Sequence, residues 1–175
     1  HNEHGFDYTR ISNPTREHLE ETVSALEGAK RSLAFTSGMA AISAVFELFA
    51  PGDRVVCSED LYGGTVLLMD LVGKKNGLKL SFVDTTDPQA LTAAVTAGTK
   101  AIYIETPSNP MMNVTDIRLC ADLAKQAGAL LIVDNTFLSP YFQNPLELGA
   151  DIVVHSGTKY LCGHNDTLSG FLCFA

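Results

Sequence analysis

The fold is decided by two stretches, Ala129-Leu-Leu-Ile-Val-Asp134-Asn-Thr136 and Asp151-Ile-Val-Val-His155-Ser-Gly-Thr-Lys159-Tyr160. Each contains a run of apolar residues that does not alternate with polar ones, a pattern typical of strands covered on both faces. Each run ends in polar or charged side chains. If the two strands are parallel neighbours in one sheet, Asp134 and Lys159 lie at the same edge of that sheet, where such folds bind their ligands.

The rest of the chain repeats this alternation of apolar runs and helical patterns. Strands are predicted at Ser32–Thr36, Arg54–Ser58, Lys79–Val83, Ala101–Glu105, Ala129–Asp134, Asp151–His155 and Gly170–Ala175. Helices are predicted at Thr15–Glu27, Gly38–Phe49, Tyr62–Lys75, Pro88–Ala97 and Val114–Ala127. Repeated strand–helix–strand units of this length predict an α/β protein with three α-β-α layers and a mostly parallel sheet.

The composition excludes several classes of protein. The 175 residues include 12 Lys and Arg against 20 Asp and Glu, a net charge of −8 that disfavours a nucleic-acid partner. A hydrophobic content of 46% indicates a globular chain, and the apolar runs are too short to span a membrane. Four cysteines without a C-x-x-C pair, and no secretory signal, predict reduced thiols in a cytoplasmic protein.

Both ends of the sequence look cut. Residues 1–14 fit neither the strand nor the helix pattern, so we expect an irregular arm there and one domain over residues 15–175. The chain starts at His1 without an initiator Met, and it stops at Ala175 inside an apolar run. We therefore expect these residues to belong to a longer polypeptide.

Asp134 and Lys159 together suggest pyridoxal phosphate (PLP) chemistry. A buried acid can keep a ring nitrogen protonated, and a partly desolvated amine can bond the cofactor's aldehyde carbon. Each residue alone has an ordinary explanation, because an Asp after a strand is usually a turn or cap residue and a Lys usually lies in solvent. The functional interpretation is favoured only because Asp134 and Lys159 are expected at the same edge of the sheet.

A phosphate group needs backbone N–H donors, and one segment offers them. Ser37-Gly38-Met39 ends a predicted strand and opens a helix, whose N-terminus favours an anion, and Ser156 and Thr158 could add hydroxyl donors. An ordinary N-cap explains Ser37 equally well. The sequence has neither a Walker lysine motif nor a G-x-G-x-x-G motif, which disfavours nucleotide binding.

Further candidates follow other strands. Tyr62, beside Gly63 and Gly64, could stack on a flat ring or could simply pack at the helix start. Asn109 lies in a stiff proline-flanked loop that could present its amide to a cofactor, although Asn-Pro is also a plain turn signal. We expect no metal site from His155, His164 and Asp166, whose spacing matches no known ligand pattern, and no thiol nucleophile at Cys162.

Six motifs, in order along essentially the whole chain, resemble the Cys/Met-metabolism family of PLP-dependent enzymes. The resemblance is carried by Tyr8-Thr-Arg10-Ile-Ser-Asn13-Pro14-Thr15, Ser37-Gly38-Met39-Ala40, Tyr62-Gly63-Gly64-Thr65, Glu105-Thr-Pro-Ser-Asn109-Pro110, Val133-Asp134-Asn-Thr136-Phe137 and the lysine signature Asp151–Gly170. It implies the large domain of an aspartate aminotransferase-like PLP-transferase fold, here truncated, without the small C-terminal domain that supplies the arginine for the substrate carboxylate.

The resemblance also implies a role for each matching residue. Lys159 would bind the cofactor covalently and carry the α-proton, Asp134 would pair with the ring nitrogen, and Tyr62 would stack on the ring and help protonate the leaving sulfur. The remaining implied cofactor contacts are Gly38, Met39, Ser156 and Thr158 at the phosphate, Asn109 and Thr136 near the ring, and Tyr8 and Arg10 at the phosphate of a neighbouring subunit. A dimer, and a tetramer built from two such dimers, is implied with them.

The activity implied by the resemblance is transsulfuration on a sulfur amino acid. The best match is a cystathionine lyase that releases a thiol, a 2-oxo acid and ammonia. Cystathionine γ-synthase or a homoserine-ester sulfhydrylase, which carry out γ-replacement, is the alternative within enzymes. A truncated cofactor-binding module without catalysis is the alternative from another class.

Overall fold

The protein is built around one seven-stranded sheet, described here from a computed structural model that covers residues 5–175. The strand order is β1-β7-β6-β5-β4-β2-β3, and β7 alone among these strands runs antiparallel to its neighbours. The strands are β1 (Arg31–Phe35), β2 (Arg54–Ser58), β3 (Lys79–Val83), β4 (Thr99–Glu105), β5 (Leu130–Asp134), β6 (Ile152–Ser156) and β7 (Gly170–Phe174). All seven predicted strands are confirmed; β2 and β3 have the predicted bounds, and the ends of the others differ by at most two residues.

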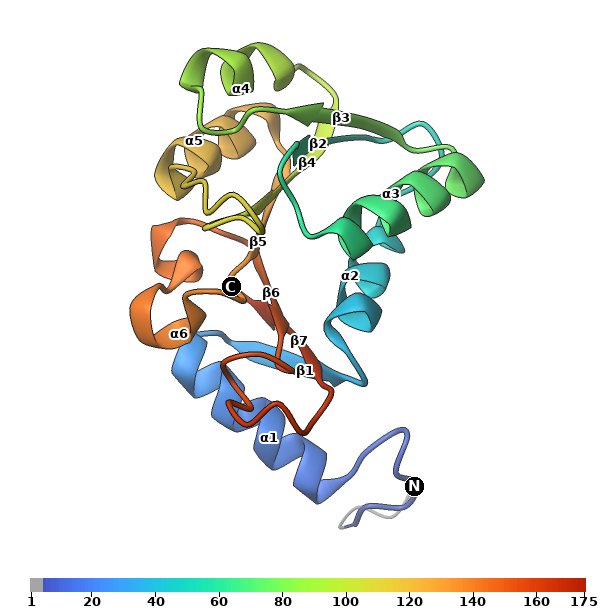
Figure 1. The fold of residues 1–175 in the computed structure, drawn as a ribbon. Helices are drawn as coiled ribbons and strands as arrows, with labels where there is room; N and C mark the ends of the chain where they lie inside the picture. The colour runs from blue at the N-terminus through green and yellow to red at the C-terminus, as the bar shows by residue number, and fades with distance from the viewer. Residues whose placement is uncertain (1–4) are drawn as a thin grey trace.

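Helices cover both faces of the sheet, so the predicted three layers are confirmed (Figure 1). Helices α2 (Gly38–Phe46) and α3 (Gly63–Asn76) lie on one face, and α1 (Pro14–Glu27) and α5 (Ile117–Ala127) lie on the other. The elements α4 (Pro88–Ala94), α6 (Ser139–Phe142) and the 3-10 helix η1 (Pro145–Leu148) complete the described chain. Of the helices within residues 5–175, none has both the length and the apolar character needed to cross a membrane.

Several helix ends differ from the prediction for local reasons. Helix α5 begins at Ile117 instead of Val114, because the Asp116 carboxylate accepts the N–H groups of Arg118 and Leu119 and caps the helix there. Helices α2 and α4 end three residues early, at Phe46 and Ala94. The short α6 and η1 were not predicted, because each spans only four residues and carries no hydrophobic period.

Two hydrophobic cores, one on each face, hold the layers together. On the α2–α3 face, Phe46 and Met69 are fully buried against Tyr103 of β4. On the α1–α5 face, Leu91 and Ile102 are equally buried. Fully burying one such side chain contributes roughly 1.5–3 kcal/mol. The central strands are thus fixed from both sides, which holds their carboxyl ends in place.

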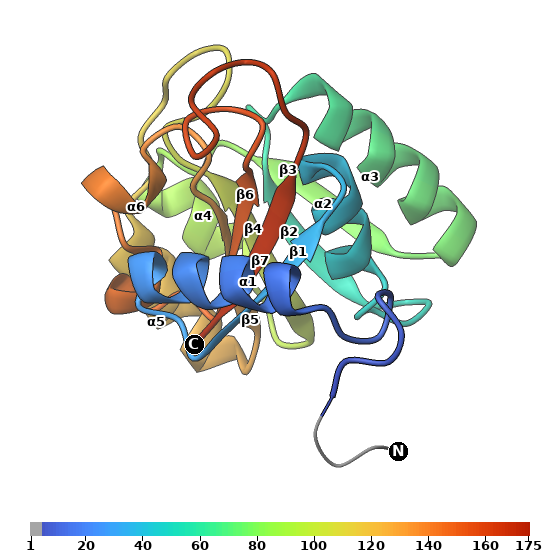
Figure 2. The ribbon, with the colours of Figure 1, turned by 90° about the horizontal axis from the view of Figure 1, so that it is seen from below.

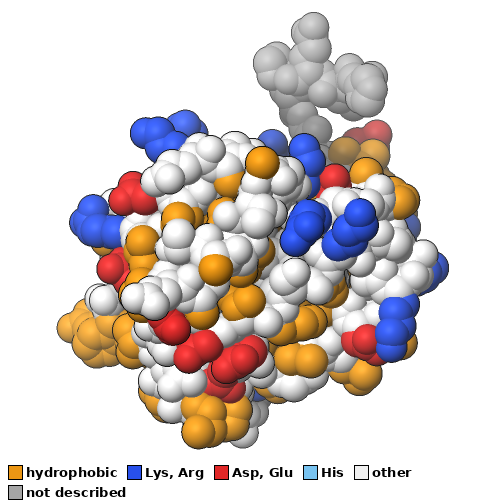
Figure 3. Space-filling view, turned by 90° about the horizontal axis from the view of Figure 1, so that it is seen from above, with side chains coloured by type: hydrophobic (Ala, Val, Ile, Leu, Met, Phe, Trp, Pro, Cys, Tyr) orange, Lys and Arg blue, Asp and Glu red, His pale blue; other side chains and the backbone are white. Residues whose placement is uncertain are grey.

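The surface carries mixed charge. Seen from the side of β3 and α4, Lys, Arg, Asp and Glu side chains are spread among polar atoms, with hydrophobic patches between them (Figure 3). The four cysteines are free. Among the described residues no group of three or more His, Cys, Asp or Glu side chains could hold a metal ion.

A buried ion pair lies behind the sheet edge on the α1 face. His155 Nε2 contacts Glu27 Oε1, and both side chains are almost completely buried. The Asn135 side-chain amide donates to the same Glu27 oxygen at 3.0 Å. His155 Nε2 is therefore used in a contact that joins β6 to the end of α1, and Asn135, which follows β5, bonds the same Glu27 oxygen.

We expect His155→Leu to lower the free energy of unfolding by about 1–3 kcal/mol, because it removes the buried hydrogen-bond partner of Glu27 Oε1. The double variant with Glu27→Leu should recover much of that loss. Urea unfolding measures both. The matched control is Lys74→Ala, which breaks the exposed Lys74–Asp70 pair (2.8 Å) and should cost about 1 kcal/mol or less. A His155→Leu cost as small as the control's would contradict the expectation.

Candidate active site

The site lies where three parallel strands end. Strands β4, β5 and β6 pair in parallel, so Glu105, Asp134 and Ser156 come to one edge of the sheet. The loops after β4 and β6 leave this same end (Figure 2). A cavity of about 180 Å³ opens there and is lined by Ser37, Gly38, Met39, Ile42, Tyr62, Glu105, Asn109, Asp134, Thr136, Phe137, Ser156, Thr158, Lys159 and Leu168. Nine of the eleven residues predicted from the sequence line it.

Asp134 is the buried acid of the cavity, with 6% of its surface exposed. The Thr136 hydroxyl donates to Asp134 Oδ1 at 2.5 Å and the Thr136 N–H donates to the same oxygen at 3.0 Å. Burial raises the pKa of Asp134 above its ordinary value, while the Thr136 donors lower it in part. The Thr136 hydroxyl also accepts the Ser156 N–H at 2.9 Å, which ties the ends of β5 and β6 together.

Lys159 reaches the same cavity from the turn that follows β6. Its backbone N–H donates to the Ser156 carbonyl at 3.2 Å, which closes that turn. The residue is exposed, so its amine is accessible to a small molecule. The structure therefore brings an amine and a buried carboxyl, 25 residues apart in sequence, to one cavity.

The N-terminus of α2 forms the adjoining wall. The Ser37 hydroxyl caps the Ala40 N–H at 3.1 Å, so the ordinary capping role holds for Ser37. The N–H groups of Gly38 and Met39, in the first helical turn, have no intrahelical acceptor. A Cβ on Gly38 would lie 2.7 Å from Ser156 Cβ, so only glycine permits this close approach of helix and strand end. The Thr158 hydroxyl is held by the Ser169 backbone, from which it accepts an N–H at 3.2 Å.

Tyr62 stands at the start of α3 with 48% of its surface exposed. A Cβ on Gly64 would lie 2.5 Å from its ring, so Gly64 provides the space in which the ring lies. The exposure does not fit the alternative of a packed core aromatic, and the ring is free to contact a ligand.

Glu105 is a cavity residue that the sequence analysis did not single out. It stands directly opposite Asp134 in the β4–β5 register, and its Oε2 accepts the Tyr62 N–H at 2.8 Å. Burial, followed by the negative charge of Asp134, raises the pKa of Glu105 to about 8. Its place at the end of an apolar strand was the available signal, the same one that identified Asp134.

The Asn109 loop is held by a separate cluster. The Ser108 hydroxyl donates to Asp60 Oδ2, and the Asn113 side-chain amide donates to the same oxygen at 3.3 Å. Asp60 precedes Tyr62 by two residues, so the cluster joins the loop before Tyr62 to the Asn109 loop.

Tyr8 and Arg10 are the two predicted residues that do not line the cavity. The Tyr8 ring is half-exposed, and the Arg10 guanidinium lies 5.9 Å above it. The arm that carries them is held to α1 by Arg16, which donates to the Thr9 carbonyl at 2.7 Å. Residues 1–4 of the predicted arm lie outside the described residues.

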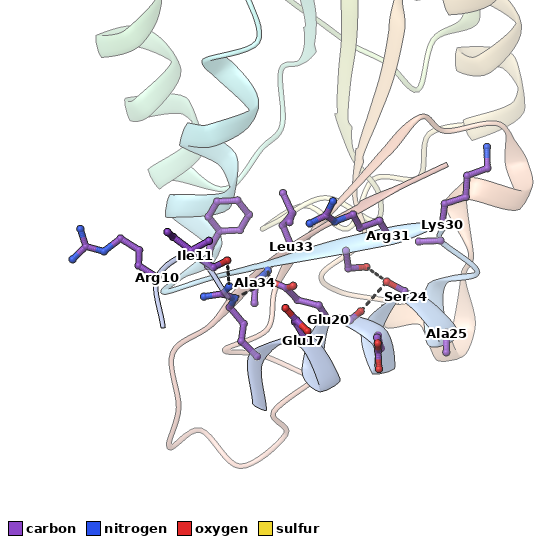
Figure 4. A pocket seen from close by; sticks show the side chains of 15 residues that line it. Arg10, Ile11, Glu17, Glu20, Ser24, Ala25, Lys30, Arg31, Leu33 and Ala34 are labelled. Carbon is purple, nitrogen blue, oxygen red and sulfur yellow. Dashed lines mark hydrogen bonds and ion pairs between the residues drawn. The ribbon is translucent and has the colours of Figure 1, made fainter. Parts of the chain in front are cut away.

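A larger cleft, of about 860 Å³, lies between α1 and β1 (Figure 4). Arg10, Glu17, Glu20 and Arg31 line it, but no buried reactive pair converges there. Its Glu20 side chain accepts the Ala34 N–H at 2.9 Å, a bond that fastens α1 to β1. The smaller cavity beside Asp134 and Lys159 is therefore the candidate active site.

Comparison with known proteins agrees with this geometry. Residues 1–175 match the model of a family described as Cys/Met metabolism PLP-dependent enzyme. The chain belongs to that family. It is 54% identical over 171 residues to cystathionine gamma-lyase of Bacillus subtilis and 53% identical over 169 residues to cystathionine gamma-synthase of Haemophilus influenzae. These alignments cover 98% and 96% of this chain and 45% and 46% of the relatives.

A solved structure gives the same result for the fold. The crystal structure of cystathionine gamma-lyase from Lactobacillus plantarum, complexed with L-serine, matches with a TM-score of 0.96 and 47% sequence identity. The match covers 99% of this chain and 45% of that one. The chain thus spans about half the length of the relatives that it matches.

The cavity fits the cofactor of this family. PLP needs an amine for its aldehyde, an acid for its ring nitrogen and donors for its phosphate. Lys159, Asp134 and the start of α2 offer these three in the lining of one cavity. The close packing of Gly38 on Ser156 leaves backbone N–H groups, instead of a side chain, facing the phosphate side.

Gly38→Ala tests the close approach. The added methyl would overlap Ser156, so we expect a loss of about 1–3 kcal/mol in unfolding free energy and weaker PLP binding. Gly63→Ala is the matched control, since a Cβ there meets no atom within 4 Å, and it should change neither quantity measurably. Urea unfolding and a PLP titration measure the two effects. Equal results for the two variants would contradict the geometry.

Proposed function

We propose that this chain forms the cofactor-binding part of a PLP-dependent transsulfuration enzyme, and that the enzyme is a cystathionine lyase. The observation that carries the proposal is that Lys159 and Asp134 face one cavity beside the start of α2. Family membership adds support, because the family is PLP-dependent.

Lys159 and Asp134 have different roles in the proposed reaction. When bound, PLP supplies an electron sink for the carbanion left at the substrate's α-carbon. Lys159 Nζ would hold the cofactor at its aldehyde carbon and would serve as the base for the α-proton. The Asp134 carboxyl, oriented by its bonds from Thr136, would pair with the ring nitrogen and favour its protonated form.

The other predicted residues bind and orient. The N–H groups of Gly38 and Met39 would bind the phosphate, together with the hydroxyl groups of Ser156 and Thr158. Tyr62 would stack on the ring and donate a proton to the leaving sulfur, and Asn109 and Thr136 would hold the ring region. In this scheme the chain's own contribution is orientation, charge placement and proton transfer.

We also propose that the active site is completed by a second copy of the chain. Residues 15–175 would be the cofactor-binding domain, and the preceding arm would bring Tyr8 and Arg10 to the partner's phosphate. Tyr8 lies outside its own cavity, and the Tyr141 and Phe142 rings are 82% and 76% exposed, which supports a self-associating surface. A homotetramer in the cytoplasm, where the four free thiols stay reduced, fits this scheme.

Within the proposal, two reaction types are compared: elimination and γ-replacement. A gamma-lyase and a gamma-synthase are nearly equally similar to this chain. We favour elimination, and γ-replacement on an activated homoserine ester is the alternative. Incubating the full-length enzyme with cystathionine should release ammonia and a 2-oxo acid. Formation of cystathionine from a homoserine ester and cysteine, without ammonia release, would favour the alternative.

Lys159→Ala tests the site itself. Full-length protein saturated with PLP should be yellow, and the variant should lose the visible band of the bound cofactor and at least about a thousandfold in turnover. Lys125→Ala, on the exposed face of α5, is the control and should keep both. Absorbance spectra and ammonia release measure the effects. A colourless wild-type protein at saturating PLP would contradict the proposal.

A further inference from the structure

Glu105 is a buried carboxyl for which the proposed function has no role. It lies at the edge of β4 with 6% of its surface exposed, and it lines the cavity with Asp134 and Lys159. A buried carboxyl is costly unless its oxygens are bonded or protonated. Its neighbours therefore indicate what it does.

The contacts of Glu105 connect it to the loop that carries Tyr62. Its Oε2 accepts the Tyr62 N–H at 2.8 Å, across 43 residues of sequence. Tyr62 is the first residue before α3, and no side chain caps that helix, so Glu105 is the side chain that anchors this helix start. The Tyr62 ring is half-exposed, so little packing fixes it otherwise.

Glu105 also shares its surroundings with Asp134, its register partner on β5. Two carboxyls this close in a buried site resist ionising together. Asp134 has two Thr136 donors on one oxygen and the nearby His155, all of which favour its charged form. Glu105 accepts only backbone N–H groups, from Tyr62 and Asn109, and these do not offset its burial and the negative charge of Asp134, so the proton of the pair belongs on Glu105.

We propose that Glu105 is a positioning residue of this site, whose protonated carboxyl anchors the Tyr62 backbone over the cavity and leaves the single negative charge on Asp134. The proposal rests on the proposed function for its meaning, since Tyr62 and Asp134 are the groups that would meet the cofactor ring. The proposal makes two claims that can be tested without cofactor: the Tyr62 N–H bonds the Glu105 carboxyl, and the Glu105–Asp134 pair holds one proton.

The pH dependence follows from the groups around Glu105. Facing it are Asp134 on β5, Asp60 after β2, Tyr103 on the same strand and Lys159 across the cavity. The two aspartates add negative charge, and burial holds the pKa of Tyr103 far above neutrality, so that Tyr103 stays uncharged. With a folded pKa of about 8, Glu105 keeps its proton to a higher pH than in the unfolded chain. Its contribution to stability is therefore full below the ordinary glutamate pKa and lost as pH rises toward 8.

The first test uses the full-length protein without PLP. We expect the Tyr62 amide to exchange with deuterium about tenfold faster in Glu105→Ala, because its acceptor is gone, and within threefold of wild type in Glu105→Gln, which keeps an acceptor oxygen. Unchanged exchange in Glu105→Ala would overturn the anchoring role. Circular dichroism confirms that each variant is folded, and if Glu105→Ala is not, the second test, which needs only Glu105→Gln, decides the proposal.

The second test measures urea-unfolding midpoints between pH 5 and pH 8, again without PLP. The wild-type midpoint should fall with rising pH relative to Glu105→Gln, whose residue 105 has no proton to lose. Glu59→Gln is the matched control, since Glu59 is exposed on the same side of the sheet edge, and its profile should parallel the wild type. Parallel profiles for wild type and Glu105→Gln would overturn the shared proton.

The third test adds PLP. Glu105→Ala should bind PLP at least about tenfold more weakly, and Glu105→Gln should stay within threefold of wild type. If Glu105→Ala speeds exchange of the Tyr62 amide but leaves the affinity for PLP unchanged, the claim that Glu105 positions Tyr62 for the cofactor is overturned. Failure of the wild-type protein to bind PLP would instead overturn the proposed function, while the two cofactor-free results would still decide the hydrogen bond and the proton.

Discussion

Parallel pairing of β4, β5 and β6 is the constraint on which the site depends. It places Glu105 opposite Asp134 and brings Ser156 beside them, whatever their distance in sequence. The pairing is fixed because both faces of these strands are buried, and a slip of one residue would turn every core side chain to the wrong face. The hydrophobic cores therefore determine where the reactive groups lie, because they fix the register of the strands that carry them.

Burial of Asp134 creates an electrostatic cost that the surrounding residues partly offset. The Thr136 hydroxyl and N–H bond its Oδ1, and the Thr136 oxygen in turn accepts the Ser156 N–H. A carboxylate held in this way is oriented before any ligand arrives, and a cationic ring nitrogen would relieve the remaining cost. The same burial that makes the group costly makes it useful for holding a proton on a ring.

Much of the fold could be predicted because the central strands β4, β5 and β6 are largely buried and their apolar runs are nearly unbroken. The same rule, that reactive residues follow the strands, located Asp134, Ser156 and Lys159, whereas Thr136 came only from the family resemblance. Glu105 also ends an apolar strand, but it was not singled out because no reactive partner such as Lys159 could be assigned to it from the sequence. Only the register with Asp134 and the bond to Tyr62 connect it to the site.

Contacts between residues that are far apart in the sequence could not be predicted either. Nothing local links Glu27 to His155, 128 residues later, and the pair exists because α1 packs where β6 ends. Helix α5 was placed three residues early because Val114 continues the apolar spacing, whereas the Asp116 cap decides the start. The spacing of apolar residues indicates which face of a helix is buried, whereas the capping residue determines where the helix begins.

The central claim is that Lys159 is the residue that bonds the cofactor. Reducing the PLP-loaded full-length protein with borohydride makes that bond permanent, and mass spectrometry of a digest then locates it. The account predicts that the cofactor mass is found on the peptide that contains Lys159, at close to one per chain. Finding it on any other lysine, or on none, would contradict the account.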